Sequence, residues 1–212
     1  YPMSSLRRLV LVRHGDTDAH SGERLIGSGD PSLSASGRDE MRRARAALAG
    51  QVVDLVVSSP ARRAFQSAAV LTGGAPLRLE PDFREIHFGR WEGRSLAEIQ
   101  SADPVLFQQW RDLAPGFEYP GGELRAAFRA RVQRGLDRVL ATNAIGALLV
   151  IHKGVIRAIV ESLTSQPPER EHPAFGEAIV VTRRGDGTWR VGSHSSNPPG
   201  VPLAAPIAVA RG

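Results

Sequence analysis

Cysteine is absent from this 212-residue chain, and long hydrophobic runs are absent as well. Without cysteine there can be no disulfide and no thiolate chemistry. No apolar run approaches the roughly 20 residues of a membrane-spanning helix. The N-terminal stretch lacks the apolar region and the cleavage site of a signal peptide. The sequence therefore predicts a cytoplasmic protein with no membrane partner.

Aromatic residues are scarce and lysine is nearly missing. Aromatics make up 6% of the chain, the net charge is +5, and Lys153 is the only lysine beside many arginines. Nucleic-acid-binding surfaces usually combine basic side chains with stacking aromatics. Here most arginines lie among acidic residues in helical stretches such as 38–48, which is typical of a solvated helix surface. We therefore expect no nucleic-acid partner.

Short apolar runs alternate with helical patterns along the sequence. The runs 8–15, 52–59 and 146–154 are apolar on successive residues, as in strands covered on both faces. Helical spacing and turn residues then predict these elements: helices over 33–50, 60–71, 95–100, 103–113 and 123–141, a helix from 155, and a hairpin over 178–193. This alternation predicts an α/β fold, a three-layer α/β/α sandwich around a mostly parallel sheet.

The chain length favours a single domain with a large core. We expect one domain over residues 1–212, with a lid-like helical region at about 90–125 and a proline-rich tail at 195–212. Helix starts are expected at Ser34 or Ser36, at Ser95 with Glu98 as a capping box, and at Asp103.

Polar residues follow three of the predicted strands. Arg13 and His14 follow the first strand, Ser59 and then Arg62 follow the second, and His152 follows the third. The carboxyl ends of parallel strands meet at one edge of a sheet, where ligands bind. We therefore expect these side chains to converge on one site.

The chemistry of these residue types points to an anion. Arginine forks match phosphate oxygens, and a helix N-terminus favours negative charge. Histidine in such a setting can act as a nucleophile or as a general acid or base. The sequence has no acidic cluster for magnesium, no zinc spacing, no P-loop and no serine-nucleophile motif. At this point a phosphate or a carboxylate ligand fits equally well, with no metal and no cofactor expected.

Five segments of the chain, taken in order, match one set of motifs over roughly residues 8–165. They are LVRHGDT, GSGDPSLSASG, VSSPARRAFQSA, REIHFGRWEGRS and IHKGVIRAI. These segments resemble the motifs of the histidine phosphatase, or phosphoglycerate mutase-like, superfamily; the third is similar to its Ser-Ser-x-x-x-Arg segment. One such motif alone has little specificity, but five in order are highly specific. The resemblance implies the phosphoglycerate mutase-like fold.

The resemblance also implies roles for individual residues. His14 would attack phosphorus and become a phosphohistidine, and Glu85 would protonate the leaving oxygen and then activate water. The phosphoryl oxygens would be held by Arg13, Arg62 and His152. His152 would be a cation if its ring is protonated. Since Glu85 must be protonated in the first step, we expect a raised pKa for its carboxyl.

Other positions are weaker candidates. Asp82 and Glu92 are the alternatives to Glu85 because they lie close to it in the sequence. The weaker substrate-binding candidates are His20, Gly27, His87 and Lys153. Three positions depart from the family pattern: His20 in place of a frequent asparagine, Ile26 in place of the mutases' serine or threonine, and Lys153 in place of glycine. We hypothesise that Lys153 binds a second anionic group of the substrate.

These features predict a metal-independent phosphomonoesterase that acts on a small phosphorylated metabolite. The short chain and the loop at 88–95 resemble the small-molecule phosphatase branch, of the α-ribazole phosphatase and broad-specificity type, more than the mutases. Two alternatives stay open: a phosphoryl transfer of the phosphoglycerate mutase type, and a non-catalytic protein that binds a phosphorylated ligand. A homodimer is also left open.

Overall fold

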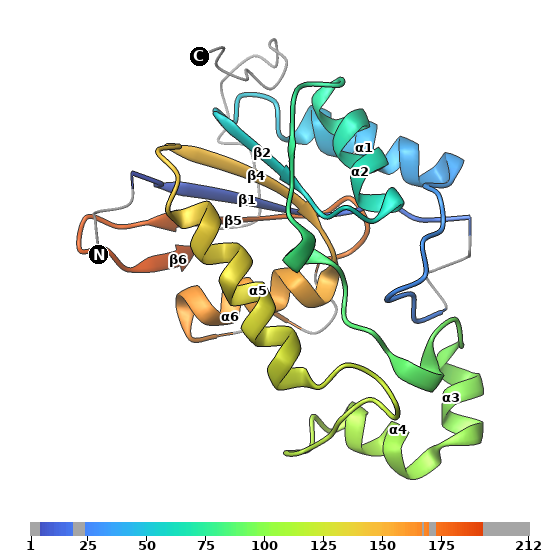
Figure 1. Ribbon diagram of the computed structural model, residues 1–212. Helices are drawn as coiled ribbons and strands as arrows, with labels where there is room; N and C mark the ends of the chain where they lie inside the picture. Colours follow the sequence, from blue (N-terminus) through green and yellow to red (C-terminus); the bar gives the residue numbers. More distant parts are fainter. Residues whose placement is uncertain (1–4, 19–23, 167, 170–172, 193–212) are drawn as a thin grey trace.

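A six-stranded mixed sheet forms the centre of the computed structural model, which describes residues 5–18, 24–166, 168–169 and 173–192 (Figure 1). The strands in sheet order are β3 (Arg78–Leu79), β2 (Leu55–Ser58), β4 (Gly146–Ile151), β1 (Arg8–Arg13), β5 (Ala178–Arg183) and β6 (Trp189–Val191). The pairs from β3 to β1 are parallel, whereas β5 is antiparallel to both β1 and β6. The predicted mostly parallel sheet is confirmed.

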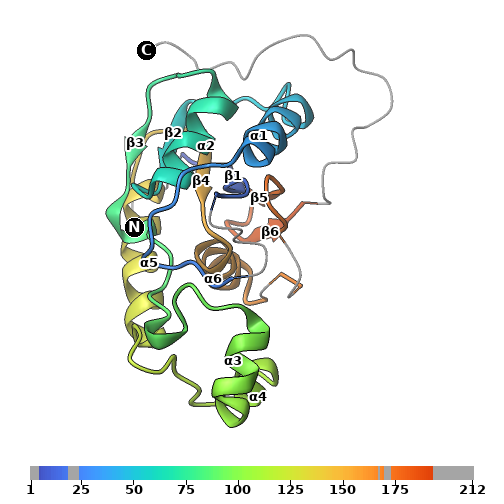
Figure 2. The ribbon, with the colours of Figure 1, turned by 90° about the vertical axis from the view of Figure 1, so that its right-hand side faces the viewer.

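Helices cover both faces of this sheet. On one face lie α1 (Ala35–Ala47) and α2 (Arg62–Thr72), and on the other lie α5 (Arg125–Leu140) and α6 (Lys153–Thr164) (Figure 2). The predicted three-layer α/β/α arrangement is therefore confirmed.

The alternation of side chains along β1 shows why the layers form. Leu9 and Leu11 point into the core cluster that includes α5 and α6, while Val10 and Val12 point into the cluster that includes α1 and α2. All four side chains are almost completely buried. Because successive strand residues face opposite sides, an unbroken apolar run is what a strand between two helical layers requires.

The helix starts follow the capping residues of the sequence. The Ser34 hydroxyl accepts the Gly37 N–H over 3.0 Å, so Ser34 rather than Ser36 begins α1. At α3 (Leu96–Ala102), Ser95 and Glu98 form the predicted capping box. These local bonds satisfy N–H groups that a helix start leaves free.

A small helical segment built from α3 and α4 (Pro104–Arg111) lies away from the sheet, as Figures 1 and 2 both show. It has its own aromatic cluster, in which Trp91 packs against Trp110 and Tyr119 with ring centroids 6.3 and 5.9 Å apart. Asp103 precedes α4 as predicted, but its carboxylate does not cap the helix. It accepts the Trp91 Nε1–H over 2.7 Å and also binds Arg90.

The remaining differences from the sequence-based prediction are one short strand and the ends of several helices. The two-residue strand β3 was not predicted, because so short a strand has no readable periodicity. Among the helices, α2 and α5 each begin two residues later than predicted, and α6 begins two residues earlier. The predicted tail at 195–212 lies outside the described residues. Within the described ranges, no helix is both long and apolar enough to span a bilayer.

Candidate active site

Polar residues from parallel strands meet at one edge of the sheet. In the register of β1 and β4, Arg13 lies opposite Ile151, and the His14 N–H donates to the Ile151 carbonyl over 3.0 Å. His14 and His152 therefore follow the two strands at the same level, with their ring centroids 5.0 Å apart. Ser59 follows β2 beside them. The predicted convergence of these strand ends is confirmed.

The ring of His14 is held in one tautomer. Its Nδ1 lies 2.8 Å from the Gly15 carbonyl oxygen, which can only accept, so Nδ1 carries the proton. Nε2 keeps its lone pair, to which the Arg63 Nε–H donates over 3.2 Å. Burial, reinforced by the charges of Arg63 and Arg13, lowers the pKa of His14 well below its usual 6.5. The imidazole is therefore neutral at physiological pH.

Gly15 is needed because the first two motifs touch through their backbones. A Cβ at Gly15 would overlap the backbone of Gly37 in α1, and a Cβ at Gly37 would overlap the backbone of Asp16. The Gly15 N–H also donates to the Ser67 hydroxyl of α2 over 3.1 Å. These contacts fix the segment that carries His14 against both helices.

The second arginine of the site is Arg63, which corrects the prediction of Arg62. The Arg62 side chain is exposed, and its backbone N–H donates to Asp30 Oδ1 over 2.7 Å. Successive helix residues point about 100° apart. Since Arg62 faces solvent at the start of α2, its neighbour Arg63 faces the edge of the sheet and His14.

The Arg63 guanidinium is fully buried and holds the loop before α1. Its Nη1 donates to the Gly29 carbonyl over 2.6 Å and its Nη2 donates to the Gly27 carbonyl over 2.9 Å. Burial lowers the pKa of Arg63, which nevertheless stays cationic. The family spacing Ser-Ser-x-x-x-Arg, counted from Ser58, ends at Arg63, so the register of that motif identifies the residue.

Arg13 is held by the loop that precedes β5. Its Nη1 donates to the Pro173 carbonyl over 3.0 Å, and its guanidinium stacks 3.8 Å above the Phe175 ring centroid. Burial lowers the pKa of Arg13 to about 10. The Arg13 Nε is buried and has no hydrogen-bond partner within the described ranges. Phe175 also lies 5.6 Å from the His14 ring, and no sequence motif pointed to it.

His152 is completely buried at the start of α6. Its Nε2 lies 2.8 Å from the Ser59 hydroxyl, while its Nδ1 lacks a hydrogen-bond partner among the residues that the structure describes. Burial lowers the pKa of His152 well below 6.5, and the positive charge of Arg63 lowers it further. A protonated His152 is therefore not the state of the free site.

Glu85 reaches the same site from the loop after β3. Its Oε1 accepts the Ile86 N–H and its Oε2 accepts the Gly154 N–H, each over 3.0 Å. A Cβ at Gly154 would overlap Glu85 Oε1, so this contact explains the glycine two residues after His152. Burial raises the pKa of Glu85 although both backbone hydrogen bonds oppose it. The direction of this shift agrees with the raised pKa that the sequence analysis expects for the Glu85 carboxyl.

The two alternative acids are engaged elsewhere. Asp82 pairs with Arg138 over 2.5 Å and with Arg134 over 3.5 Å. Glu92 is a backbone anchor: its carboxylate accepts the N–H groups of Gly27, Ser28 and Phe88. Of the three candidates, Glu85 alone is held against the strand end that carries His152.

A pocket of about 260 Å³ opens beside Glu85. Its lining residues are Gly27, Ser28, Ala61, Pro81, Arg84, Glu85, His87, Glu123 and Arg131. Two of the weaker sequence candidates, Gly27 and His87, thus border the site. Lys153 is the half-buried first residue of α6 and is not among the lining residues, and His20 lies outside the described residues.

Positive charge at the site comes from arginine. Arg13 and Arg63 flank two neutral histidines, and their charges act on both imidazoles. Among the residues that the structure describes, no group of three or more His, Cys, Asp or Glu side chains is arranged to hold a metal ion. The arrangement places one histidine lone pair beside two guanidinium groups, with the Glu85 carboxyl held against the neighbouring strand end.

A comparison with protein families identifies the chain. The model of the histidine phosphatase superfamily (branch 1) matches residues 9–196. The chain therefore belongs to the histidine phosphatase superfamily, and the resemblance inferred from its motifs is confirmed.

Several relatives and structural neighbours of the chain are named as small-molecule phosphatases. A glucosyl-3-phosphoglycerate phosphatase of Mycolicibacterium vanbaalenii is 34% identical over 172 residues, which cover 76% of each chain. A putative α-ribazole-5′-phosphate phosphatase of Escherichia coli superposes with a TM-score of 0.77 at 25% identity, covering 93% of this chain and all of the other. A mycobacterial glucosyl-3-phosphoglycerate phosphatase gives 0.76 at 29% identity, covering 87% of this chain and 96% of that one.

Proposed function

We propose that this protein hydrolyses a small phosphomonoester through a phosphohistidine formed on His14. The observation that carries the proposal is the tautomer of His14, whose Nδ1–H is bound to the Gly15 carbonyl. That bond keeps Nε2 unprotonated, so its lone pair, which now accepts the Arg63 Nε–H, is the one available for attack beside the guanidinium groups of Arg13 and Arg63. Covalent catalysis of this kind divides one difficult displacement into two easier ones.

In the first step, a bond forms between His14 Nε2 and phosphorus while the bond from phosphorus to the leaving oxygen breaks. Arg63 shifts its Nε–H from the histidine lone pair to a phosphoryl oxygen, and the Arg13 Nε–H, which has no partner among the described residues, binds another. Glu85 gives its proton to the leaving oxygen, for which its raised pKa suits it.

His152 contributes a neutral donor in this proposal. The proposal assigns the donor role to the Ser59 hydroxyl, 2.8 Å from His152 Nε2, so that Nδ1 carries the ring proton and can bind a phosphoryl oxygen. The buried Nδ1 that has no partner within the described ranges is the atom expected to make this contact. A bound phosphoryl dianion would also raise the pKa of His152 by direct charge attraction.

In the second step, water attacks the phosphohistidine. Glu85, now a carboxylate, takes a proton from the water as the new bond to phosphorus forms. His14 leaves as the neutral imidazole, and inorganic phosphate departs. Glu85 therefore acts first as an acid and then as a base, and its half-buried position at the rim of the pocket suits both roles.

The substrate is proposed to be a small phosphorylated metabolite in the cytoplasm. The names of its relatives, glucosyl-3-phosphoglycerate phosphatase and α-ribazole phosphatase, support a small phosphomonoester rather than a macromolecule. The region of about 90–125, which contains α3 and α4, is proposed as a lid, because Glu123 near its end borders the pocket. Binding to nucleic acid weakens as the salt concentration rises. If the retention of this protein on a DNA resin does not change with salt, the protein has no nucleic-acid partner of this kind.

The test is a panel of phosphomonoesters incubated with the protein and a metal chelator, with release of inorganic phosphate as the readout. We expect turnover of at least one small phosphomonoester without added metal, and none by the variant His14→Ala. Product analysis separates hydrolysis from transfer to a second alcohol. Wild-type turnover by the His14→Ala variant would contradict the mechanism.

A further inference from the structure

Residues 173–177, directly before β5, form a loop that is bonded to the backbone of Arg13. The Arg13 N–H donates to the Glu177 carbonyl, and the Gly176 N–H donates to the Arg13 carbonyl, each over 3.1 Å. None of the five sequence motifs includes this loop, which follows the last of them in the chain. The end of β1 therefore fixes a further segment beside the residues that are proposed to bind phosphate.

The same loop holds the Arg13 side chain at two points. Its Nη1 donates to the carbonyl of the buried Pro173 over 3.0 Å, and its guanidinium carbon lies 3.8 Å above the centroid of the half-buried Phe175 ring. A guanidinium above an aromatic ring is attracted to the negative face of that ring. One hydrogen bond at the end of the fork and one ring against its face together restrict how the guanidinium can rotate.

The loop has its own means of keeping this shape. The Ala174 N–H donates to the Glu177 carboxylate over 2.6 Å, and the Glu177 N–H donates to the Ala174 carbonyl over 3.1 Å. Gly176 has a φ of 71°, and a Cβ there would lie 3.2 Å from the Cβ of Glu40 in α1. Phe175 is thus carried by a short turn that is bonded internally and packed against a helix.

The ring of Phe175 lies next to the two groups that meet phosphorus in the proposed function. Its centroid is 5.6 Å from that of the His14 ring, and it covers one face of the Arg13 guanidinium. The buried Arg13 Nε has no hydrogen-bond partner among the described residues. A buried donor of this kind needs a partner, which a ligand oxygen would supply. With Nη1 already engaged and one face covered, Nε–H is a donor held in place for that oxygen.

We propose that Phe175 is a positioning residue for phosphate binding, which acts by holding the Arg13 guanidinium so that its Nε–H meets a phosphoryl oxygen. The inference rests on the proposed function, in which Arg13 binds that oxygen. Phe175 has no polar side-chain atom to offer the ligand, so its effect passes through Arg13. Fixing a donor before the ligand arrives lowers the entropy that binding costs.

The first test is equilibrium binding of inorganic phosphate to the full chain by titration calorimetry, which needs no turnover. Phe175→Leu and Phe175→Met keep an apolar side chain and remove the ring. For both we expect the Kd for phosphate to rise about 3- to 30-fold, the loss of a stacked and largely desolvated cation. Phe175→Tyr keeps the ring and should bind phosphate as the wild type does.

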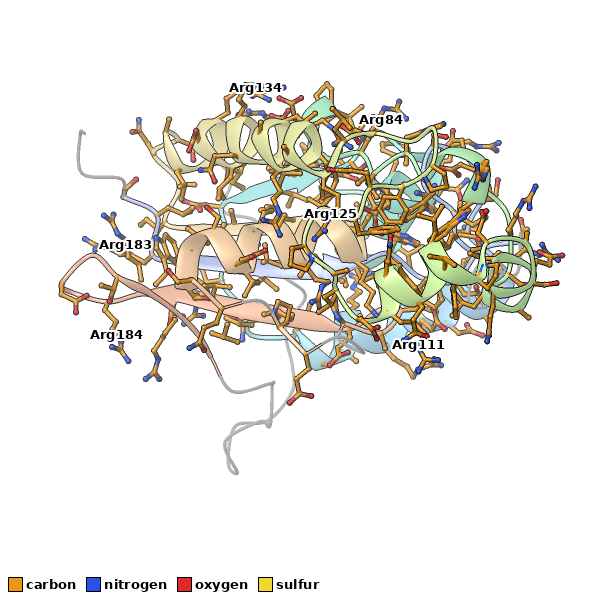
Figure 3. The ribbon with its side chains drawn as sticks, turned by 90° about the horizontal axis from the view of Figure 1, so that it is seen from below. Arg84, Arg111, Arg125, Arg134, Arg183 and Arg184 are labelled. Carbon is orange, nitrogen blue, oxygen red and sulfur yellow. The ribbon has the colours of Figure 1, made fainter. Side chains whose placement is uncertain are left out.

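The second test is a double-mutant cycle on kcat/KM for p-nitrophenyl phosphate. Phe175→Leu should lower kcat/KM by a similar factor in the wild type and cause no further loss in Arg13→Met, which has no guanidinium to hold. Arg184→Met is the matched control, because it removes the same charge at the exposed turn between β5 and β6, beyond the other end of β5 (Figure 3). In that background the full effect of Phe175→Leu should remain.

Three results would overturn the inference. The variants without the ring could bind phosphate as tightly as the wild type, or Phe175→Tyr could lose as much affinity as they do. The loss caused by Phe175→Leu could also persist in Arg13→Met, which would show that the ring acts through His14 or through the fold. Failure of the proposed function looks different: no phosphomonoester is hydrolysed, while phosphate binding still depends on the ring.

Discussion

The His14 imidazole owes its proposed reactivity to what surrounds it rather than to its own chemistry. Two buried guanidiniums, Arg13 and Arg63, lie beside it, and burial with their charges lowers its pKa. A protonated imidazole has no lone pair at Nε2 and cannot attack phosphorus. The same cations that would bind the phosphoryl oxygens therefore also keep the nucleophile neutral.

Arg63 and Arg62 provide a matched pair for testing this environment. The variant Arg63→Ala removes the buried fork next to His14, and we expect kcat/KM for p-nitrophenyl phosphate to fall about 10²- to 10³-fold. The variant Arg62→Ala removes an exposed side chain one position away and should stay close to the wild type. Equal losses in the two variants would contradict the assignment of Arg63.

Glu85 is tested by the basicity of the leaving group. An alkyl alcohol needs a proton as it leaves, whereas p-nitrophenolate hardly does, so the acid matters only for the first. For Glu85→Gln we expect a loss of about 10²- to 10⁴-fold in kcat on an alkyl phosphate and a far smaller one on p-nitrophenyl phosphate, where formation of the phosphohistidine limits the rate. The isosteric variant Asp82→Asn serves as the control. A loss that is the same for both substrates would rule out Glu85 as the acid.

At the scale of elements, the loop that carries Glu85 is held in place by side chains of the neighbouring helix α5. Arg131 donates to the carbonyls of Asp82, Arg84 and Glu85, and about two turns further along α5 Arg138 binds the buried carboxylate of Glu80. The loop itself has little regular structure. Its position relative to His14 therefore depends on these side chains of a neighbouring helix.

Arg131 is accordingly expected to be a positioning residue. The variant Arg131→Met keeps an unbranched side chain in place of the aliphatic stem but loses all of these bonds, and a small displacement of a reacting group is costly. We expect kcat to fall about 10- to 100-fold on an alkyl phosphate and less on p-nitrophenyl phosphate, following the pattern of Glu85→Gln. The control Arg134→Ala breaks only an exposed ion pair on the same helix. General damage to the fold would instead lower both activities together.

The sequence predicts correctly those elements whose defining residues lie close together in the chain. The capping box at Ser95 and the strand ends at His14 and His152 depend on nearby residues, and all were placed correctly. The error at Arg62 was one of motif register, because the Ser-Ser-x-x-x-Arg spacing counted from Ser58 ends at Arg63, and a step of one residue along a helix turns the side chain by about 100°. Phe175 and Arg131 could not be predicted, because their contacts join segments far apart in the chain.

For the whole molecule, the two buried histidines link the site to stability. Both have a pKa well below 6.5 in the folded state, so between that value and 6.5 the unfolded chain binds protons that the folded chain does not. Their contribution is therefore complete above pH 6.5 and is lost as the pH falls below it. Glu85 acts in the opposite direction, since its raised pKa makes the folded state keep its proton above pH 4.5.

This linkage predicts a pH dependence of thermal stability. Between pH 7.5 and 5.5 we expect the Tm of the wild type to decrease as the unfolded histidines become protonated. In the double variant His14→Asn/His152→Asn, which cannot take up these protons, the decrease should be smaller. The measurement is a series of thermal unfolding curves at constant ionic strength. An unchanged slope in the double variant would show that other groups cause the decrease.

The central claim, a phosphohistidine at His14, is tested most directly by trapping it. The protein is mixed with a ³²P-labelled phosphomonoester, stopped with alkali during turnover, and digested for peptide mapping. The account predicts an acid-labile, alkali-stable label on the peptide that contains His14, and no label in His14→Ala. A turnover-competent wild type that never carries the label, or a label on any other residue, would contradict the account.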